Sequence, residues 1–246
     1  MERVHNSAPT AASRVLVVST GAGWTDRLAE QLPAGEVMVL VTDSSAEALL
    51  AARNLQPRII LLDGDLRGDD GVQVCGRMRT VSDAHITMLT GRNDEATTIA
   101  GLAAGADDVL AKPFTVHEIA ARIRAVRRRV LPPATAYAVR PYSENAPGRQ
   151  EFGWLSVDLA RREVFVADEQ IRLTRTEFEI LATLAQRPGA VTTLQQMLDA
   201  VWGPRWAGST AKLHVHIGNL RRKLGDNPAR PLLVLNVRGI GYRLAV

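Results

Sequence analysis

The feature that most constrains the fold is a regular alternation of short apolar runs and helical patterns through the first half of the chain. Apolar runs bounded by turn residues are typical of buried strands, and we predict strands at 15–18, 37–41, 59–63, 86–90 and 108–111. Helical patterns follow them at 24–31, 46–54, 72–80, 95–104 and 116–129. Five such units, joined by right-handed crossovers, predict an α/β fold: a five-stranded doubly wound parallel sheet with its ligand site at the carboxyl ends of the strands.

The second half of the chain has a different pattern. Short β-rich runs come first, around 155–157, 164–166 and 171–173. Three helical patterns follow at 176–186, 193–202 and 212–224, and the chain finishes with runs at 232–237 and 242–246 around Gly239 and Gly241. Three helices and a terminal β-hairpin predict an α+β winged helix-turn-helix domain.

Length and composition set the domain boundaries. A chain of 246 residues is long enough for one or two domains. Residues 1–13 are polar and aperiodic, so we expect a disordered tail, and residues 131–150 hold four prolines with little periodicity, which is typical of a linker. The first domain is therefore expected at 14–130 and the second at 151–246.

Cysteine usage and hydropathy indicate the compartment. The single cysteine, Cys75, excludes an internal disulfide, and no Cys or His cluster has zinc-ligand spacing, so we predict no metal site of that kind. The longest apolar runs are strand-sized, and the beginning of the chain lacks a signal-peptide pattern. We expect a cytoplasmic protein with no membrane partner.

Charge is unevenly distributed along the chain. Residues 1–147 carry 16 basic and 17 acidic side chains, whereas residues 148–246 carry 14 and 9. Clustered basic residues are typical of a surface that binds a polyanion, although a solvated charged face gives the same pattern. The second domain is therefore the candidate for binding nucleic acid.

Polar residues stand at the ends of three predicted strands of the first half. Asp63, Thr90 and Lys112 end or follow the third, fourth and fifth strands, and these ends meet at one edge of a parallel sheet. Together with their flanking sequence they resemble the receiver domain of response regulators. The motifs that carry the resemblance are Leu-Leu-Asp63-Gly64-Asp65-Leu-Arg-Gly68-Asp-Asp-Gly71, Leu-Thr90-Gly91 and Gly105-Ala-Asp-Asp-Val-Leu-Ala-Lys112-Pro113-Phe114.

The second half is similar to the effector domain of the OmpR/PhoB family of response regulators. Its motifs are Thr174-Arg-Thr-Glu177-Phe178, Val201-Trp202-Gly203, Val215-His216-Ile217 with Leu220-Arg221, and Val237-Arg238-Gly239-Ile-Gly241-Tyr242. The resemblance covers nearly the whole chain from Arg14. It implies a DNA-binding transcription regulator rather than an enzyme, with double-stranded DNA and RNA polymerase as partners.

The resemblance assigns Asp63 as the phosphoacceptor, and the family holds Mg²⁺ with this aspartate and two acids that follow the first strand. Here Ser19 and Thr20 stand in place of those acids, and Val109 replaces the aromatic residue expected before Lys112. Hydroxyls alone are poor Mg²⁺ ligands. We therefore expect an atypical receiver with a pocket of Ser19, Thr20, Asp63, Asp65, Thr90 and Lys112, in which Asp63 pairs directly with Lys112 and no cofactor is needed.

Two alternatives stay open. In the first, Asp65 points into the pocket and partly restores a Mg²⁺ site, so that a histidine kinase phosphorylates Asp63; a solvated loop acid is the other interpretation of Asp65. In the second, Asp63-Gly-Asp65 acts as the nucleophile and acid of a haloacid-dehalogenase-type phosphatase. Arg67 occupies the usual hydroxyl position of that motif, and Asp107 and Asp108 precede Lys112 rather than follow it, which argues against the enzyme.

The helix at 212–224 resembles the recognition helix of the family. We predict that Asn219 contacts adenine and Arg221 contacts guanine in a major groove. Contacts to phosphate are predicted for Lys212, His216 and Arg222, and Arg238 of the wing is expected to reach a minor groove. Two residues depart from the family: His214 replaces a common acid, and Gly218 replaces a basic residue.

The resemblance also implies a homodimer through the fourth helix, fifth strand and fifth helix of the receiver. The residues expected in that interface are Ile99, Leu102, Ala103, Asp107, Asp108, Glu118, Arg122 and Arg124. Thr98 replaces the basic partner that Glu118 has in the family, and a solvated helix face is the alternative interpretation of these charges.

Overall fold

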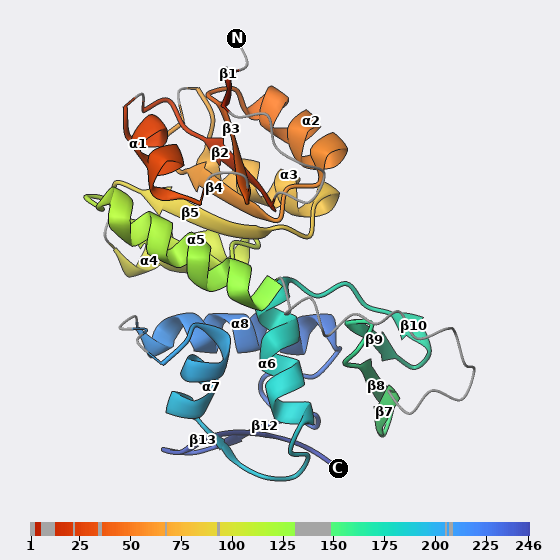
Figure 1. Ribbon diagram of the computed structural model, residues 1–246. Coiled ribbons are helices and arrows are strands. Elements are labelled where there is room, and N and C mark those ends of the chain that lie inside the picture. Colours follow the sequence, from red (N-terminus) through yellow and green to blue (C-terminus); the bar gives the residue numbers. More distant parts are fainter. Residues whose placement is uncertain are drawn as a thin grey trace. The chain divides into compact units, whose positions relative to one another are not determined.

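A computed structural model describes residues 3–5, 13–21, 23–33, 36–66, 68–92, 94–130, 149–204, 206 and 209–246 (Figure 1). The chain divides into two compact units, Met1–Ala136 and Tyr137–Val246. Most of the predicted linker, residues 131–148, lies outside the described residues. No helix within the described ranges is long and apolar enough to cross a membrane.

The first unit is built on a parallel sheet. Its strands are β2 (Ser13–Val18), β3 (Val37–Thr42), β4 (Ile59–Asp63), β5 (His85–Thr90) and β6 (Asp108–Ala111). They pair in the order β3-β2-β4-β5-β6, and each of these pairings is parallel. The predicted doubly wound five-stranded sheet is confirmed, with strand bounds within two residues of those expected from the apolar runs.

Five helices flank this sheet: α1 (Trp24–Gln31), α2 (Ser45–Leu55), α3 (Gly71–Val81), α4 (Glu95–Ala103) and α5 (Val116–Val130). Side chains of Ser44, Asp70 and Asp94 accept hydrogen bonds from backbone N–H groups in the first turns of α2, α3 and α4, which fixes where these helices begin. Apolar residues of α1 and α5 pack on alternate residues of β2 and β4, which lie on one face of the sheet. Helices α1 and α5 thus cover one face of the sheet.

A sixth strand, β1 (Arg3–His5), lies within the disordered tail predicted at residues 1–13, of which residues 1–2 and 6–12 are outside the described part of the chain. It pairs antiparallel with β3, with Arg3 opposite Val41. Residue Ser13 likewise belongs to β2. An edge strand offers unpaired N–H and C=O groups to any extended segment, whatever its side chains, so composition alone does not show this pairing.

The second unit has two small antiparallel sheets and three helices. The first sheet holds β7 (Arg149–Phe152), β8 (Leu155–Asp158), β9 (Glu163–Val166) and β10 (Glu169–Gln170). The helices are α6 (Arg175–Ala185), α7 (Leu194–Val201) and α8 (Thr210–Lys223). The second sheet holds β11 (Thr192–Thr193), β12 (Val234–Val237) and β13 (Gly241–Leu244). This arrangement confirms the winged helix-turn-helix prediction.

Two boundaries in the second unit differ from the prediction. Residues 149–152 form strand β7, paired with β8, instead of the end of a linker. The strand expected at 171–173 lies at Glu169–Gln170 instead, because Ala167 and Asp168 adopt positive φ angles of 48° and 66° and turn the chain early into β10. Residues after Gln170 then lead directly into the Thr174 cap of α6.

The core of the second unit determines which face of α8 is free. Leu213, Ile217, Leu220 and Leu224 of this helix and its C-cap are buried in one cluster with apolar residues of α6, α7 and β13. Their spacing of three and four residues defines a single inward stripe. Residues on the opposite side of α8 are left to solvent.

Candidate functional site

The pocket at the carboxyl ends of the sheet is centred on Asp63. This carboxylate ends β4 and is only 4% exposed. The Lys112 Nζ atom, which follows β6, lies 2.6 Å from Asp63 Oδ1, and the Ser19 hydroxyl, which follows β2, donates to Asp63 Oδ2 at 3.0 Å. The predicted direct pair between Asp63 and Lys112 is present.

Asp65 belongs to the same pocket. Its Oδ2 atom lies 3.1 Å from Lys112 Nζ and accepts from the Gly91 N–H at 2.9 Å, while its own N–H donates to Asp63 Oδ1 at 3.0 Å. A Cβ atom at Gly91 would lie 2.9 Å from Asp65 Oδ2, so glycine permits this contact. Asp65 keeps the exposure expected of a loop acid, with 50% of its side-chain surface accessible, and its carboxylate also faces Lys112, as the other interpretation predicts.

Opposite charges shift the pKa values of two pocket groups. Burial alone would raise the pKa of the Asp65 carboxyl, but the Lys112 ammonium and the Gly91 N–H together hold it below its ordinary value. Burial alone would lower the pKa of Lys112, but hydrogen bonds to Asp63 and Asp65 hold it above its ordinary value. Both shifts favour the charged forms of Asp65 and Lys112, so the contact between them is an ion pair near neutral pH.

Thr20 and Thr90 stand at the same edge of the sheet. Thr20 is partly buried and lies two residues after β2. The Thr90 hydroxyl accepts from the Arg92 N–H at 3.1 Å, so it shapes the loop after β5. Arg67, which entered the comparison with phosphatases, lies outside the described residues.

The residues present do not fit a Mg²⁺ ion. Mg²⁺ requires six oxygen ligands at about 2.0–2.1 Å in octahedral geometry. The described pocket offers two carboxylates, and the Lys112 ammonium already occupies the space between them. Among the residues that the structure describes, no group of three or more His, Cys, Asp or Glu side chains could hold a metal ion.

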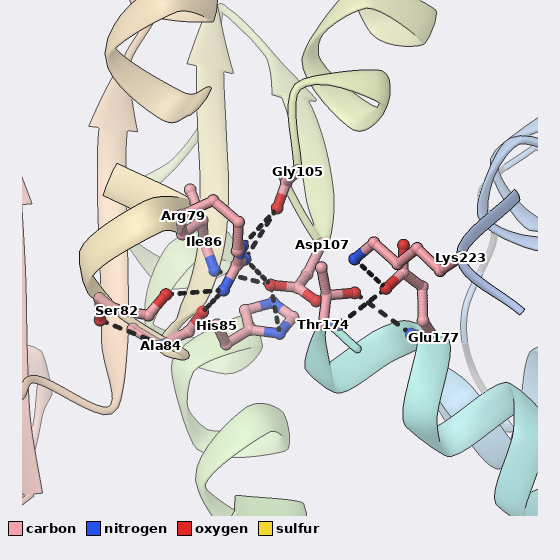
Figure 2. Close-up of polar contacts among 10 residues, drawn as sticks. All are labelled: Arg79, Ser82, Ala84, His85, Ile86, Gly105, Asp107, Thr174, Glu177 and Lys223. Carbon is pink, nitrogen blue, oxygen red and sulfur yellow. Dashed lines mark hydrogen bonds and ion pairs between the residues drawn. The ribbon is translucent and has the colours of Figure 1, made fainter. Parts of the chain in front are cut away.

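Several residues predicted for a receiver dimer have internal partners instead. Asp107 is fully buried, and its Oδ2 atom accepts from Arg79 Nη2 at 2.7 Å and from the Ile86 N–H at 3.0 Å (Figure 2). Arg79 also donates to the carbonyls of Gly105 and Ala84 (Figure 2). Asp107 therefore closes a network that joins α3 to the sheet, and its assignment to the dimer interface is wrong.

The other predicted interface residues divide into two groups. Leu102 is 1% exposed and belongs to the core, so its assignment is wrong. Arg124 is partly exposed and its Nη1 atom donates to the Gln31 carbonyl of α1, and its place in the interface stays a prediction. Asp108 is buried and pairs with Arg122 at 2.6 Å within the same chain. Ile99, 41% exposed, and Ala103, also exposed, remain available on α4. Glu118 and Arg122 are partly exposed on α5 and pair with each other at 3.2 Å.

Burial along α8 corrects the predicted DNA-reading residues. Arg221 is 9% exposed, and its Nε atom donates to the Val234 carbonyl at 3.0 Å. Asn219 is buried, with its Oδ1 atom accepting from Arg222 Nη2 at 3.0 Å. The His216 ring is buried beside Trp202, with ring centroids 5.8 Å apart. Arg221 and His216 face the core, so their assignments as DNA contacts are wrong, whereas Asn219 bonds to the exposed Arg222 and stays a predicted base contact.

The solvent face of α8 is formed by other residues. Thr210, His214 and Arg222 are exposed, and Gly218 is partly exposed between the last two. Their spacing of four residues defines one stripe. Lys212 is partly buried, with its ammonium 5.9 Å from the Trp206 ring centroid. In the β12–β13 turn, Arg238 and Ile240 are exposed, as expected for a wing.

A second network in Figure 2 lies within the second unit and orients α8. Glu177 Oε2 accepts from Lys223 Nζ at 2.6 Å and from the Thr174 N–H at 2.7 Å (Figure 2). Glu177 is buried, so this contact ties the last turn of α8 to the first turn of α6. The Thr174 and Glu177 motif thus positions α8.

Comparisons with known proteins identify both units. Residues 15–124 match the family model for a response regulator receiver domain, and residues 168–244 match the model for the C-terminal domain of transcriptional regulatory proteins. The chain thus has the two domains of a response regulator with a transcription-regulator output domain.

Relatives with the same domain pair cover nearly the whole chain. The DNA-binding response regulator MtrA of Mycolicibacterium smegmatis is 35% identical over 235 residues, 95% of this chain and 97% of MtrA. The sensory transduction protein RegX3 of Mycobacterium bovis is 37% identical over 231 residues, 94% of this chain and 98% of RegX3. A RitR mutant is a similar solved structure, with a TM-score of 0.74, 25% identity and coverage of 95% of this chain and 99% of that chain. The chain belongs to the OmpR/PhoB family of response regulators.

Proposed function

We propose that this protein is a sequence-specific DNA-binding transcription regulator whose receiver works without Mg²⁺-dependent phosphorylation. The observation that carries the second part is the position of Lys112, whose ammonium lies 2.6 Å from Asp63 and 3.1 Å from Asp65. Lys112 supplies the positive charge that holds the two carboxylates together, where Ser19 and Thr20 replace the metal-binding acids of the family.

The electrostatics support this proposal. Opposite unit charges about 4 Å apart near a protein surface interact by roughly 4 kcal/mol, and water around the partly exposed Lys112 reduces that figure. Phosphorylation of Asp63 would add negative charge beside Asp65 and would break the short contact to Lys112. A bound divalent cation would offset the free-energy cost of these two changes, but the pocket offers no further carboxylates to attract one.

The DNA-binding part rests on the second unit. The exposed stripe of α8 ends in Arg222, and the wing carries Arg238, so a major-groove helix and a minor-groove wing are the expected contacts. Lys212 and Arg222 are expected to contact phosphate. Removal of either should weaken binding to all sequences and reduce the salt slope by about one unit.

Assembly and partners follow from the same proposal. A homodimer would use the exposed α4 residues Ile99 and Ala103 with Glu118 and Arg122 of α5, and would cover two half-sites about 10 bp apart.

We place the protein in the cytoplasm with RNA polymerase as its partner, and assign it no enzymatic activity. If Asp63 were a phosphatase nucleophile, Asp63→Asn would abolish release of phosphate from a test ester; we expect no such release from the wild type.

A second candidate function is a conventional regulator that a histidine kinase phosphorylates on Asp63. The orientation of the Asp65 carboxylate toward Asp63 and Lys112 favours it, because a second acid in the pocket could assist a metal.

DNA affinity and dimerisation separate the two candidates. A duplex is first selected by the full chain from a randomised pool, and its affinity is then measured in EDTA and in Mg²⁺ with acetyl phosphate. We expect the affinities in EDTA and in Mg²⁺ with acetyl phosphate to agree within about twofold, and Asp63→Asn to bind the duplex with the same affinity. Sedimentation of the unphosphorylated chain at tens of micromolar should show dimers. A tenfold gain with acetyl phosphate that Asp63→Asn loses would favour the conventional regulator.

A further inference from the structure

His214 is the imidazole on the solvent face of α8, and it has an ordered partner. Its Nδ1 atom lies 2.7 Å from the Tyr242 hydroxyl, which belongs to β13. The two rings are tilted, with centroids 6.1 Å apart. The side chain of His214 is thus directed by the wing sheet, although it is exposed to solvent.

Tyr242 is well suited to hold this imidazole in one orientation. It is buried and lies on the central strand of its sheet, paired with Asn236 on β12 and Thr192 on β11. The Arg221 guanidinium lies 5.8 Å from its ring centroid. Burial raises the pKa of Tyr242, with the nearby Arg221 opposing this, so the phenol keeps its proton at neutral pH.

The direction of the hydrogen bond between Tyr242 and His214 depends on which nitrogen of the imidazole carries hydrogen. A buried O–H group requires an acceptor, and among the described contacts the His214 Nδ1 atom provides one. When Nδ1 accepts, the neutral imidazole must carry its hydrogen on Nε2. The outward nitrogen is then a hydrogen-bond donor.

We infer that Tyr242 fixes His214 as the Nε2–H tautomer, so that His214 reads a purine N7 acceptor in the major groove. This inference rests on the proposed DNA binding. The purine N7 is the acceptor that guanine and adenine both present on the major-groove edge. An acid at this position would accept a hydrogen bond instead, so the histidine reverses the hydrogen-bonding character of this position.

Gly218 supports a base contact over a phosphate contact. It lies one turn after His214 on the same stripe, and a Cβ atom added there would meet nothing within 4 Å. With no side chain at this point, the helix can approach the base edges closely. An imidazole, which is shorter than arginine, needs such an approach to reach them.

The tautomer can be tested on the full chain without DNA. Histidine is labelled with ¹⁵N, and the signal of His214 is assigned by its loss in His214→Gln. At pH 8 we expect an Nε2–H tautomer in the wild type and a mixture of tautomers in Tyr242→Phe, while the signals of the other histidines stay unchanged. A wild-type ring with hydrogen mainly on Nδ1, or a ring that Tyr242→Phe leaves unaltered, overturns the inference.

The base contact is tested on the duplex that the wild-type chain selects. Each purine is replaced in turn by its 7-deaza analogue, which lacks the N7 acceptor. At one position we expect the analogue to weaken wild-type binding by about threefold to tenfold, and to have no further effect on His214→Ala. Arg222→Ala, altered on the same stripe, should keep the full 7-deaza penalty. A chain that selects no duplex overturns the proposed function, whereas a selected duplex without an N7 penalty specific to His214 overturns this inference alone.

Discussion

Replacing Arg221 should unfold the second unit more easily, because this side chain holds the wing against α8. Its Nε atom donates to the Val234 carbonyl at 3.0 Å, and its guanidinium lies over the Tyr242 ring. Arg221→Ala leaves that buried carbonyl without its charged donor and removes the packed side chain. A hydrogen bond to a charged group contributes about 1.5–3 kcal/mol, so with the lost packing we expect a loss of roughly 2–4 kcal/mol.

Thermal unfolding of the full chain, followed by far-UV circular dichroism and tryptophan fluorescence, measures this loss. The second unit should melt roughly 10–20 °C lower, while the transition of the first unit stays in place. Arg238→Ala is the matched control: its side chain is exposed in the β12–β13 turn, so stability should change by less than about 0.5 kcal/mol while DNA affinity falls. A stable Arg221→Ala variant that has lost base discrimination would restore Arg221 as a base contact and refute the structural reasoning.

Three further predictions concern the first unit. The difference in unfolding free energy between the wild type and Asp65→Asn should be constant from about pH 5 to 9 and should shrink below the ordinary Asp pKa of 3.8. The reason is that the pKa of Asp65 is lowered in the folded state, so its stabilisation is lost as the pH falls through the folded pKa. A difference that grows in acid would contradict the assignment. Burial raises the pKa of the Cys75 thiol to about 12, so a thiol reagent at pH 8 should modify Cys75 only after unfolding, and rapid labelling of the native chain would count against this burial. Asp107→Asn should destabilise the first unit by about 3–5 kcal/mol, since it leaves the Arg79 guanidinium without its buried partner. The dissociation constant of the dimer, measured by sedimentation, should stay unchanged. An unchanged stability with a weakened dimer would return Asp107 to the interface.

The sequence was sufficient for the receiver fold because each strand there is a compact apolar run and each helix has a local pattern. The pairing of Asp63 with Lys112 followed from the same topology, since both residues stand at carboxyl ends of parallel strands of one sheet, β4 and β6, with β5 between them. The position of Asp65 was less predictable. It depends on the loop after β5, where the Gly91 N–H and the missing Cβ draw its carboxylate inward.

The errors on α8 concern side chains whose environment is set by partners outside the helix. Leu213, Ile217, Leu220 and Leu224 define the inward stripe. Arg221 and His214 are seven residues apart and lie within about 20° of each other around the helix, so helical phase does not separate them. The Val234 carbonyl of β12 holds Arg221 in the core, whereas His214 stays exposed beside the Tyr242 hydroxyl. Local spacing does not show this difference.

Partners distant in sequence account for the remaining errors. Asp107 is charged and stands in a motif that predicts an interface, but Arg79 on α3 neutralises it inside the fold. No local pattern shows which of several charged residues on a helix has an internal partner.

Restoring the two missing acids tests the central claim most directly. Wild type and the Ser19→Asp/Thr20→Asp double variant are incubated with acetyl phosphate, with and without Mg²⁺, and their intact masses are measured, with Asp63→Asn added to each background. We predict no Mg²⁺-dependent mass gain in the wild type and the gain of one phosphoryl group in the double variant, lost when Asp63 is replaced. Stoichiometric, Mg²⁺-dependent phosphorylation of the wild type on Asp63 would contradict the account.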